Sequence, residues 1–370
     1  FFNLIFNPTD GGLDTFSFVS GPLTPPTTDV DPDDLFDLYG SRYYFEFLSL
    51  SDLLGSEGLE EAGLEELGGL RLGERMLYVT TVDGIAVGRL DLSGINKAFD
   101  WSETPSGILA SGKGPEVYVL MPRSNRMLVL GGSSVGPKSI YGLRGGLFEI
   151  VLGPDEQTAF VTNALSDTLQ VIDLKRKKVK MTIPTGSMPQ GIALSPDGRY
   201  LYVTNSLDNR VSKIDTLTGA VVKTAAAGQS PYGLWISPNG LELYVTDTGS
   251  GKVLVLDAED LSIRSEILVG RSPYMIRGDK EGRRLFVSNR GSDTISIIDT
   301  QDKLELAQVK VGSRPTGLAL AHGGKTLYVA NELSKSISLI DTEKMDKIAE
   351  VKLDFMPSRL AIGGGSEPAA

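Results

Sequence analysis

The sequence predicts an all-β chain: a seven-bladed β-propeller of four-stranded blades, preceded by an irregular N-terminal extension. Three observations lead to this prediction. A short strand motif recurs about every 42 residues, two further motifs keep the same phase, and turn residues separate the strands. Repeats of this length, each with four short strands, are typical of propeller blades. No stretch within the repeats keeps a helical period.

The first motif is an aromatic-Val-Thr-Asn strand, which is clearest at residues 202–205. Related strands begin at residues 78, 118, 160, 202, 244, 286 and 328. The spacing is 40 residues once and 42 residues at every later step. Seven copies of one supersecondary unit predict seven blades.

Two further motifs surround each copy. An alternating strand ends in Asp 13 residues after the aromatic position, at residues 173, 215, 257, 299 and 341. A Pro-x-Gly motif precedes the aromatic strand, with Pro at residues 105, 189, 231, 273, 315 and 357 and Leu147 in the remaining phase. Turn residues such as those at 195–198 follow it, because Pro, Asp and Gly favour tight turns. With a fourth strand, such as residues 221–224, each repeat completes a blade.

The strand count predicts how the ring closes. The first aromatic strand starts at residue 76 with no Pro-x-Gly strand before it, and the last Pro-x-Gly strand, residues 357–362, has no strands after it. We therefore expect the C-terminal strand to join the first blade and leave no open blade edge. This divides the chain into an acidic arm (1–75), a propeller (76–362) and a flexible Gly-rich tail (363–370).

The strand Tyr-Val-Thr-Asn followed by Ile-Asp-Thr at this period resembles the YVTN-repeat β-propellers of bacterial and archaeal surface proteins. The resemblance covers residues 76–362. It implies a WD40-like propeller fold and an extracytoplasmic place, in the periplasm or at the cell surface. It leaves the activity open, because propellers host binding modules, lactonases, lyases and cofactor enzymes.

Composition excludes several kinds of site. The 370 residues include no Cys and one His, which excludes disulfides, thiolate nucleophiles and sites that need two imidazoles. We expect neither a metal nor a cofactor. Residues 1–75 have a net charge of −12 and the remainder is nearly neutral, so the basic face that nucleic acids require is missing. No apolar run is long enough for a transmembrane helix.

The acidic arm holds more than half of the 13 phenylalanines and is interrupted by Gly and Pro. We expect it to dock the propeller on a protein partner in an envelope or surface complex. The aromatic residues assigned to this contact are Phe1, Phe2, Phe6, Phe36, Tyr43, Phe45 and Phe47. Because the sequence starts with Phe, we also expect a removed export signal, and a lipid anchor upstream of Phe1 stays open.

The residues that enter the Pro-x-Gly strands should line one mouth of the central channel. Amide, aromatic and arginine side chains gather at these positions. They are Gln190, Tyr232, Tyr274, Arg271, Arg314 and Arg359. Such a ring could hold an anionic or polar ligand, and it could equally line an idle funnel.

Function is predicted from the distribution of these groups. Acids and bases do not cluster at one mouth, and the acids Glu149 and Asp279 have no obvious partner, so no catalytic residue is assigned. This favours a non-catalytic scaffold or binding subunit, with the propeller as a rigid platform. Two alternatives stay open: a lactonase- or lyase-type enzyme acting at the channel mouth, and an accessory protein for cofactor biosynthesis or electron transfer.

Overall fold

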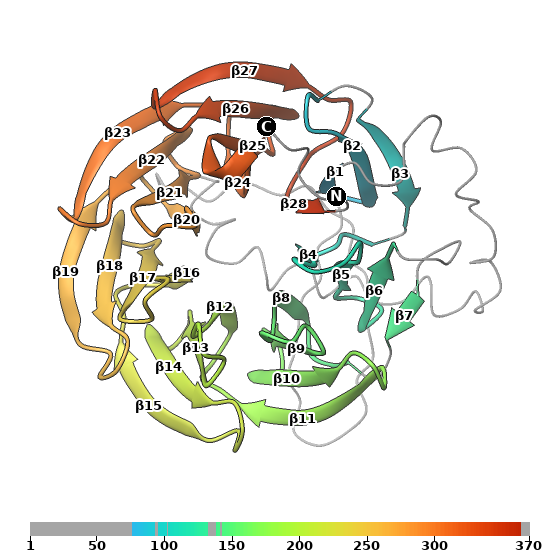
Figure 1. The fold of residues 1–370 in the computed structure, drawn as a ribbon, viewed down its shortest axis with the longest axis vertical. Helices are drawn as coiled ribbons and strands as arrows, with labels where there is room; N and C mark the ends of the chain where they lie inside the picture. Colours follow the sequence, from blue (N-terminus) through green and yellow to red (C-terminus); the bar gives the residue numbers. More distant parts are fainter. Residues whose placement is uncertain (1–75, 93–94, 102, 132–137, 141–142, 364–370) are drawn as a thin grey trace, which may run out of the picture. The chain divides into compact units, whose positions relative to one another are not determined.

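The computed structural model describes residues 76–92, 95–101, 103–131, 138–140 and 143–363. Seven antiparallel sheets of four strands surround a common axis as blades (Figure 1). The all-β, seven-bladed propeller that the sequence predicts is therefore confirmed.

The four strands of each blade follow one another from the inner to the outer strand. The first three blades are β28 (Leu360–Gly363), β1 (Met76–Thr81), β2 (Gly84–Arg89) and β3 (Asn96–Asp100); β4 (Gly107–Ala110), β5 (Val117–Met121), β6 (Arg126–Leu130) and β7 (Lys138–Ile140); and β8 (Leu147–Leu152), β9 (Thr158–Asn163), β10 (Thr168–Asp173) and β11 (Lys178–Pro184). The next two are β12 (Pro189–Leu194), β13 (Tyr200–Asn205), β14 (Arg210–Asp215) and β15 (Val221–Ala226); and β16 (Pro231–Ile236), β17 (Glu242–Asp247), β18 (Lys252–Asp257) and β19 (Ile263–Leu268). The last two are β20 (Pro273–Gly278), β21 (Arg284–Asn289), β22 (Thr294–Asp299) and β23 (Leu304–Lys310); and β24 (Pro315–Ala321), β25 (Thr326–Asn331), β26 (Ser336–Asp341) and β27 (Asp346–Lys352).

Strand β28 closes the ring. It pairs antiparallel with β1, from Met76 opposite Gly363 to Val79 opposite Leu360. The contact continues beyond the strand, because the Thr80 amide donates to the Arg359 carbonyl at 2.9 Å. The first blade is thus built from both ends of the propeller, as the strand count predicts.

The apolar core lies between neighbouring blades. Tyr202 of β13 packs in one cluster with Leu243 and Val245 of β17, in the next blade. Its hydroxyl donates to the carbonyl of Ala258 at 2.9 Å, which satisfies the polar end of a buried ring. Burying such side chains contributes about 1.5–3 kcal/mol each, so the repeated aromatic position stabilises the contact between blades.

The Thr of the repeated strand also joins adjacent blades. Thr204 Oγ1 accepts a hydrogen bond from the Gly191 amide at 2.8 Å and donates to the Tyr232 carbonyl of the next blade at 2.8 Å. Thr162, Thr246 and Ser288 make the equivalent pair of bonds. In these four blades one hydroxyl therefore satisfies two inner-strand backbone groups and holds neighbouring inner strands together.

We expect Thr204→Val to lower the free energy of unfolding by about 2 kcal/mol or more. The variant keeps the shape of the side chain, but it removes the partner of a buried N–H and of a buried C=O. Urea unfolding measures the loss. Thr204→Ser is the control, because Ser288 already fills this position in another blade. A valine variant as stable as the serine variant would contradict the role assigned to the hydroxyl.

Five of the seven third strands end in an Asp that caps the turn that follows. Asp215 Oδ1 accepts hydrogen bonds from the amides of Leu217 and Thr218, both at 3.0 Å. The same arrangement occurs at Asp257, Asp299 and Asp341. Backbone hydrogen bonds of this kind favour the ionised carboxylate, and they lower the pKa of Asp215, Asp257 and Asp341.

Acid is expected to destabilise the propeller through these turns. A carboxylate with a lowered pKa contributes stability above its unfolded pKa of about 3.9, and this stability is lost as the pH falls through the folded value. Glu350 adds to the effect, since its hydrogen bond with Lys347 lowers the pKa of its carboxyl to about 2. We expect the Tm to fall between about pH 4 and pH 2. Thermal unfolding followed by circular dichroism measures this, and a constant Tm across that range would contradict it.

Candidate functional site

The inner strands form a closed circle around the axis. Strands β4, β8, β12, β16, β20, β24 and β28 each contact the next in turn (Figure 1). At the Gly of the Pro-x-Gly motif the neighbouring strand comes very close. A Cβ added at Gly191 would lie 2.2 Å from the carbonyl oxygen of Tyr232, and one at Gly233 would lie 2.4 Å from that of Tyr274. Glycine is therefore required at this position, because the backbone of the neighbouring inner strand leaves no room for a Cβ atom.

Three blades carry a side chain where the others have this glycine. They are Glu149 in β8, Met275 in β20 and Arg359, which immediately precedes β28. Arg359 Nη1 lies 3.5 Å from Glu149 Oε2 and contacts Met275 Sδ, and all three residues are at least nine-tenths buried. Because these three blades are not neighbours, the contacts cross the centre of the ring. The break in the repeat thus creates a single asymmetric site.

Aromatic side chains complete this site. The rings of Tyr232 and Tyr274 stack with their centroids 4.0 Å apart, and their hydroxyls are hydrogen-bonded to each other. The Phe148 ring meets Tyr232 edge-on at 5.6 Å. The Arg359 guanidinium lies 5.5 Å from the ring centroids of both Phe148 and Tyr274. We call these six residues the axial cluster: Phe148, Glu149, Tyr232, Tyr274, Met275 and Arg359.

The axial cluster holds one cation, Arg359, and one carboxylate, Glu149. Burial opposes the charge of Arg359, but the electrostatic influence of Tyr274 and Glu149 outweighs it and raises the pKa of the guanidinium. Burial also lowers the pKa of Arg277, where Glu149 acts in the opposite direction. The side chain of Arg277 makes no hydrogen bond or ion pair with the described residues. Glu149 therefore pairs with Arg359 and influences Arg277 only electrostatically, so an anion that enters beside Arg277 would find a cation to pair with.

Burial and the neighbouring Tyr274 raise the pKa of Tyr232 well above its usual value. Its phenol stays neutral near pH 7 and donates its hydrogen bond to the Tyr274 hydroxyl. Arg359 Nη2 lies 3.5 Å from this hydroxyl. A cation and a neutral phenol thus lie side by side.

A second charged group adjoins the axial cluster. Arg290 Nη2 and Arg314 Nε lie 3.6 and 3.5 Å from Glu332 Oε2. The Arg290 guanidinium also lies 4.3 Å from the centre of the Tyr274 ring, which links this group to the aromatic pair. Two arginines therefore meet one carboxylate beside the cluster.

The residues predicted for the channel mouth fall into three groups. Tyr232, Tyr274 and Arg359 belong to the axial cluster, and Arg314 adjoins it through Glu332. Gln190 is buried, and its Oε1 accepts a hydrogen bond from the Ser206 hydroxyl, so its amide is engaged within its own blade. Arg271 is exposed. The aromatic residues assigned to the arm lie outside the described residues.

The expectation that Glu149 has no partner is wrong, because Arg359 pairs with it across the ring. Spacing could not show this, since the two residues are 210 positions apart in sequence. The signal that was missed is the exchange of Gly for Glu149, Met275 and Arg359 in an otherwise regular motif. Among the described residues, no three or more His, Asp or Glu side chains gather as a metal site.

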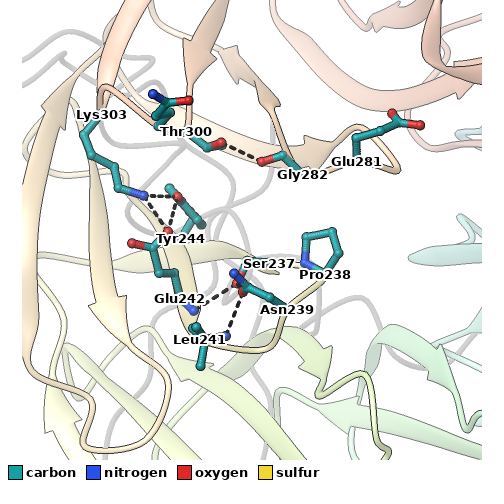
Figure 2. Close-up of a pocket in the computed structure, with 11 residues that line it drawn as sticks. Ser237, Pro238, Asn239, Leu241, Glu242, Tyr244, Glu281, Gly282, Thr300 and Lys303 are labelled. Atoms are coloured by element: carbon teal, nitrogen blue, oxygen red, sulfur yellow. Dashed lines mark hydrogen bonds and ion pairs between the residues drawn. The ribbon is translucent and has the colours of Figure 1, made fainter.

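A groove lies between the blade of β16–β19 and the blade of β20–β23 (Figure 2). Its volume is about 690 Å³, and turn residues such as Ser237 and Thr300 line it. The Tyr244 hydroxyl donates to Glu242 Oε2 at 2.7 Å, and Lys303 Nζ donates to both side chains (Figure 2). These polar groups satisfy one another, so the groove needs no ligand to balance its charges.

Solved structures of similar fold were found at low sequence identity. A functionally unknown protein from Desulfotomaculum acetoxidans DSM 771 has a TM-score of 0.70 and 14% identity, with 80% of this chain and 100% of that chain covered. A putative 6-phosphogluconolactonase from Bacteroides fragilis NCTC 9343 has a TM-score of 0.65 and 15% identity, over 78% and 98%. Hydrazine synthase from Kuenenia stuttgartiensis has a TM-score of 0.61 and 20% identity, over 70% and 89%. These similarities show the fold alone.

Sequence comparison identifies a family. No curated protein sequence matches the chain. In the described part of the chain, no helix has the length and hydrophobicity that a membrane crossing needs. The family model described as "Lactonase, 7-bladed beta-propeller" matches residues 149–355, which is more than half of the 370 residues. The chain therefore belongs to the lactonase family of seven-bladed β-propellers.

Proposed function

We propose that this protein hydrolyses a lactone at the axial cluster. Membership of the lactonase family supports this proposal, and so does the single place where the inner strands depart from their repeat. The buried pair of Glu149 and Arg359 carries it, because ester hydrolysis needs a base for water and a positive group for the oxyanion. The enzyme alternative is thereby favoured over the non-catalytic scaffold.

The proposed reaction uses the ionised form of Glu149. Its carboxylate takes a proton from water as the water oxygen adds to the lactone carbonyl carbon. The bond between that carbon and the ring oxygen then breaks, and the ring oxygen receives the proton from Glu149. Lactone and water thus give one hydroxy acid. The Arg359 guanidinium, beside the neutral pair of Tyr232 and Tyr274 hydroxyls, would stabilise the oxyanion in surroundings of low dielectric constant.

The arginines gathered here favour a lactone that carries a negative group. Arg359 pairs with Glu149 in the cluster, Arg277 feels the charge of the same carboxylate, and Arg290 and Arg314 pair with Glu332 beside it. Arginine binds carboxylate and phosphate groups through paired N–H donors. The Bacteroides fragilis neighbour is described as a putative 6-phosphogluconolactonase, which supports including 6-phosphogluconolactone in the first substrate panel.

A hydrolysis assay on neutral, carboxylated and phosphorylated lactones tests the proposal. We expect turnover of an anionic lactone, and we expect Glu149→Gln to lower kcat by about 100-fold or more. Glu266→Gln is the matched control, because Glu266 lies on the outer strand β19 and pairs with Lys252. If the parent protein turns over none of these lactones, or if Glu149→Gln is fully active, the proposal is wrong.

The YVTN-repeat resemblance, the extracytoplasmic place and the partner-binding arm stay predictions. They rest on the repeat motif and on the acidic, aromatic composition of residues 1–75. A pull-down from the source envelope with the intact chain and with residues 76–370 tests the arm. A protein partner retained by the intact chain and lost on deletion is the expected result, and equal retention by both forms would rule out docking through the arm.

A further inference from the structure

We propose that the groove between the blade of β12–β15 and the blade of β16–β19 binds a small organic monocarboxylate, which the ammonium group of Lys213 holds. This site does not depend on the lactone-hydrolysing function. The groove is lined by the turns at the ends of the inner strands β12 and β16, whereas the axial cluster lies at the beginnings of the inner strands.

Lys213 stands where the other repeats have an aliphatic core residue. The equivalent residues of the neighbouring third strands are Val171, Val255, Ile297 and Leu339. Lys213 is nevertheless only 3% exposed. A buried ammonium is unfavourable unless an anion and hydrogen-bond acceptors surround it. This blade therefore holds a buried cation at a position where the neighbouring repeats have an aliphatic side chain.

The anion that pairs with Lys213 is a surface side chain. Lys213 Nζ lies 2.6 Å from Glu259 Oε2 and 3.1 Å from the Glu259 carbonyl, and 4.3 Å from the centre of the Tyr200 ring. The Glu259 side chain is 88% exposed, although its carboxylate reaches a buried ammonium. Holding a long exposed side chain in one conformation opposes the pair entropically. The carboxylate of a ligand can therefore take the place of Glu259, which returns to water.

The groove has room and apolar surface for such a ligand. Its volume is about 340 Å³, and Pro196, Tyr200 and Leu241 are among the residues that line it. This volume is at the small end of the range for ligand pockets. A carboxylate on a short aliphatic chain or a single aromatic ring fits these walls.

The other acids of the groove limit the charge of the ligand. Asp197 accepts hydrogen bonds from the Ser195 hydroxyl and the Arg199 amide, and Asp257 caps its own turn and pairs with Arg264 at 3.1 Å. Both carboxylates are therefore engaged, yet they make the lining of the groove acidic, and Lys213 lies behind this lining against Glu259 and Tyr200. A ligand with one carboxylate fits this arrangement, and a second negative charge would be repelled.

The groove of Figure 2, between the next pair of blades, lacks the features that make Glu259 exchangeable. Val255 occupies the place of Lys213 there, and the ammonium comes from Lys303, on the turn before β23. Its partner Glu242 has a side chain only 33% exposed and also accepts from the buried Tyr244 hydroxyl (Figure 2). The Glu242 carboxylate accepts hydrogen bonds from two donors. The Glu259 side chain is exposed, so a ligand can replace its carboxylate.

Calorimetric titration of the full chain with benzoate, and with benzamide as the neutral match, tests the proposal. We expect Glu259→Gln, which removes the internal carboxylate, to bind benzoate about ten-fold more tightly than the parent. Lys213→Leu, which restores the residue type of Leu339, should not bind benzoate and should keep lactone hydrolysis unchanged. Benzamide should bind none of the three proteins.

Absence of benzoate binding by both the parent and Glu259→Gln would overturn the site. Equal binding by Lys213→Leu would overturn it as well. Glu259→Asp guards against a folding defect in Glu259→Gln, because it keeps the charge and shortens the side chain by one methylene. It should bind benzoate with an affinity between those of the parent and the Gln variant, and an affinity below that of the parent would also contradict the site.

Discussion

A chain that ends at Met356 is expected to lose cooperative folding. The shortening removes β28 and leaves the inner edge of β1 unpaired. Buried Leu360 and Ala361 are lost together with a ladder of hydrogen bonds. Each buried Leu contributes about 1.5–3 kcal/mol and each hydrogen bond about 0.5–1.5 kcal/mol, so the loss approaches the whole stability of a typical domain.

Circular dichroism and urea unfolding measure this effect. The control is a chain that ends at Gly363, which keeps β28 and removes only the tail. We expect this control to unfold within about 0.5 kcal/mol of the full chain, as is usual for changes away from packed residues. A chain ending at Met356 that still unfolds in one sharp transition would show that the ring does not need its closing strand.

Replacing Arg359 by Met is expected to destabilise the protein by about 3–5 kcal/mol, because the Glu149 carboxylate would remain buried without its cation. The variant also removes the guanidinium contacts with the Tyr232 hydroxyl and the Ser106 carbonyl. Lactone hydrolysis should be lost with them, since the oxyanion loses its cationic partner.

The double variant Arg359→Met/Glu149→Gln separates the charge effect from the packing effect. We expect it to recover a large part of the stability that the single variant loses, because no unpaired carboxylate stays buried. It should not recover hydrolysis, since both proposed catalytic groups are then missing. A single variant within about 1 kcal/mol of the parent would mean that water already screens Glu149.

The repeat made the fold predictable. Seven copies spaced by 40 or 42 residues give the number of blades, and the unmatched strands at residues 76 and 357–362 give the closure. Both follow from local strand length and turn chemistry, which a single sequence displays directly. The Thr hydroxyl that joins the blades is visible in the same motif, but its partners are backbone groups of the next repeat, and no sequence pattern records them.

The axial cluster was only partly predictable. Tyr232, Tyr274 and Arg359 stand out as variable residues beside the regular positions of the motif. Glu149 and Met275 were missed as partners of Arg359, because they belong to blades that are far apart in sequence and meet only across the ring. The more informative signal is a residue that departs from its own repeat. The same comparison singles out Lys213, which stands among aliphatic equivalents.

The closing strand has a consequence for the time at which the site exists. Arg359 directly precedes β28, and its amide is anchored by Thr80 Oγ1 at 2.8 Å, so the first and last repeats must meet before the guanidinium reaches Glu149. During synthesis six blades can pair their strands while the axis still lacks this cation. The chain can therefore bind a ligand at the axial cluster only after its final residues have docked. Such a ligand would bind chains in which the ring is closed and would not bind chains that are still being synthesised.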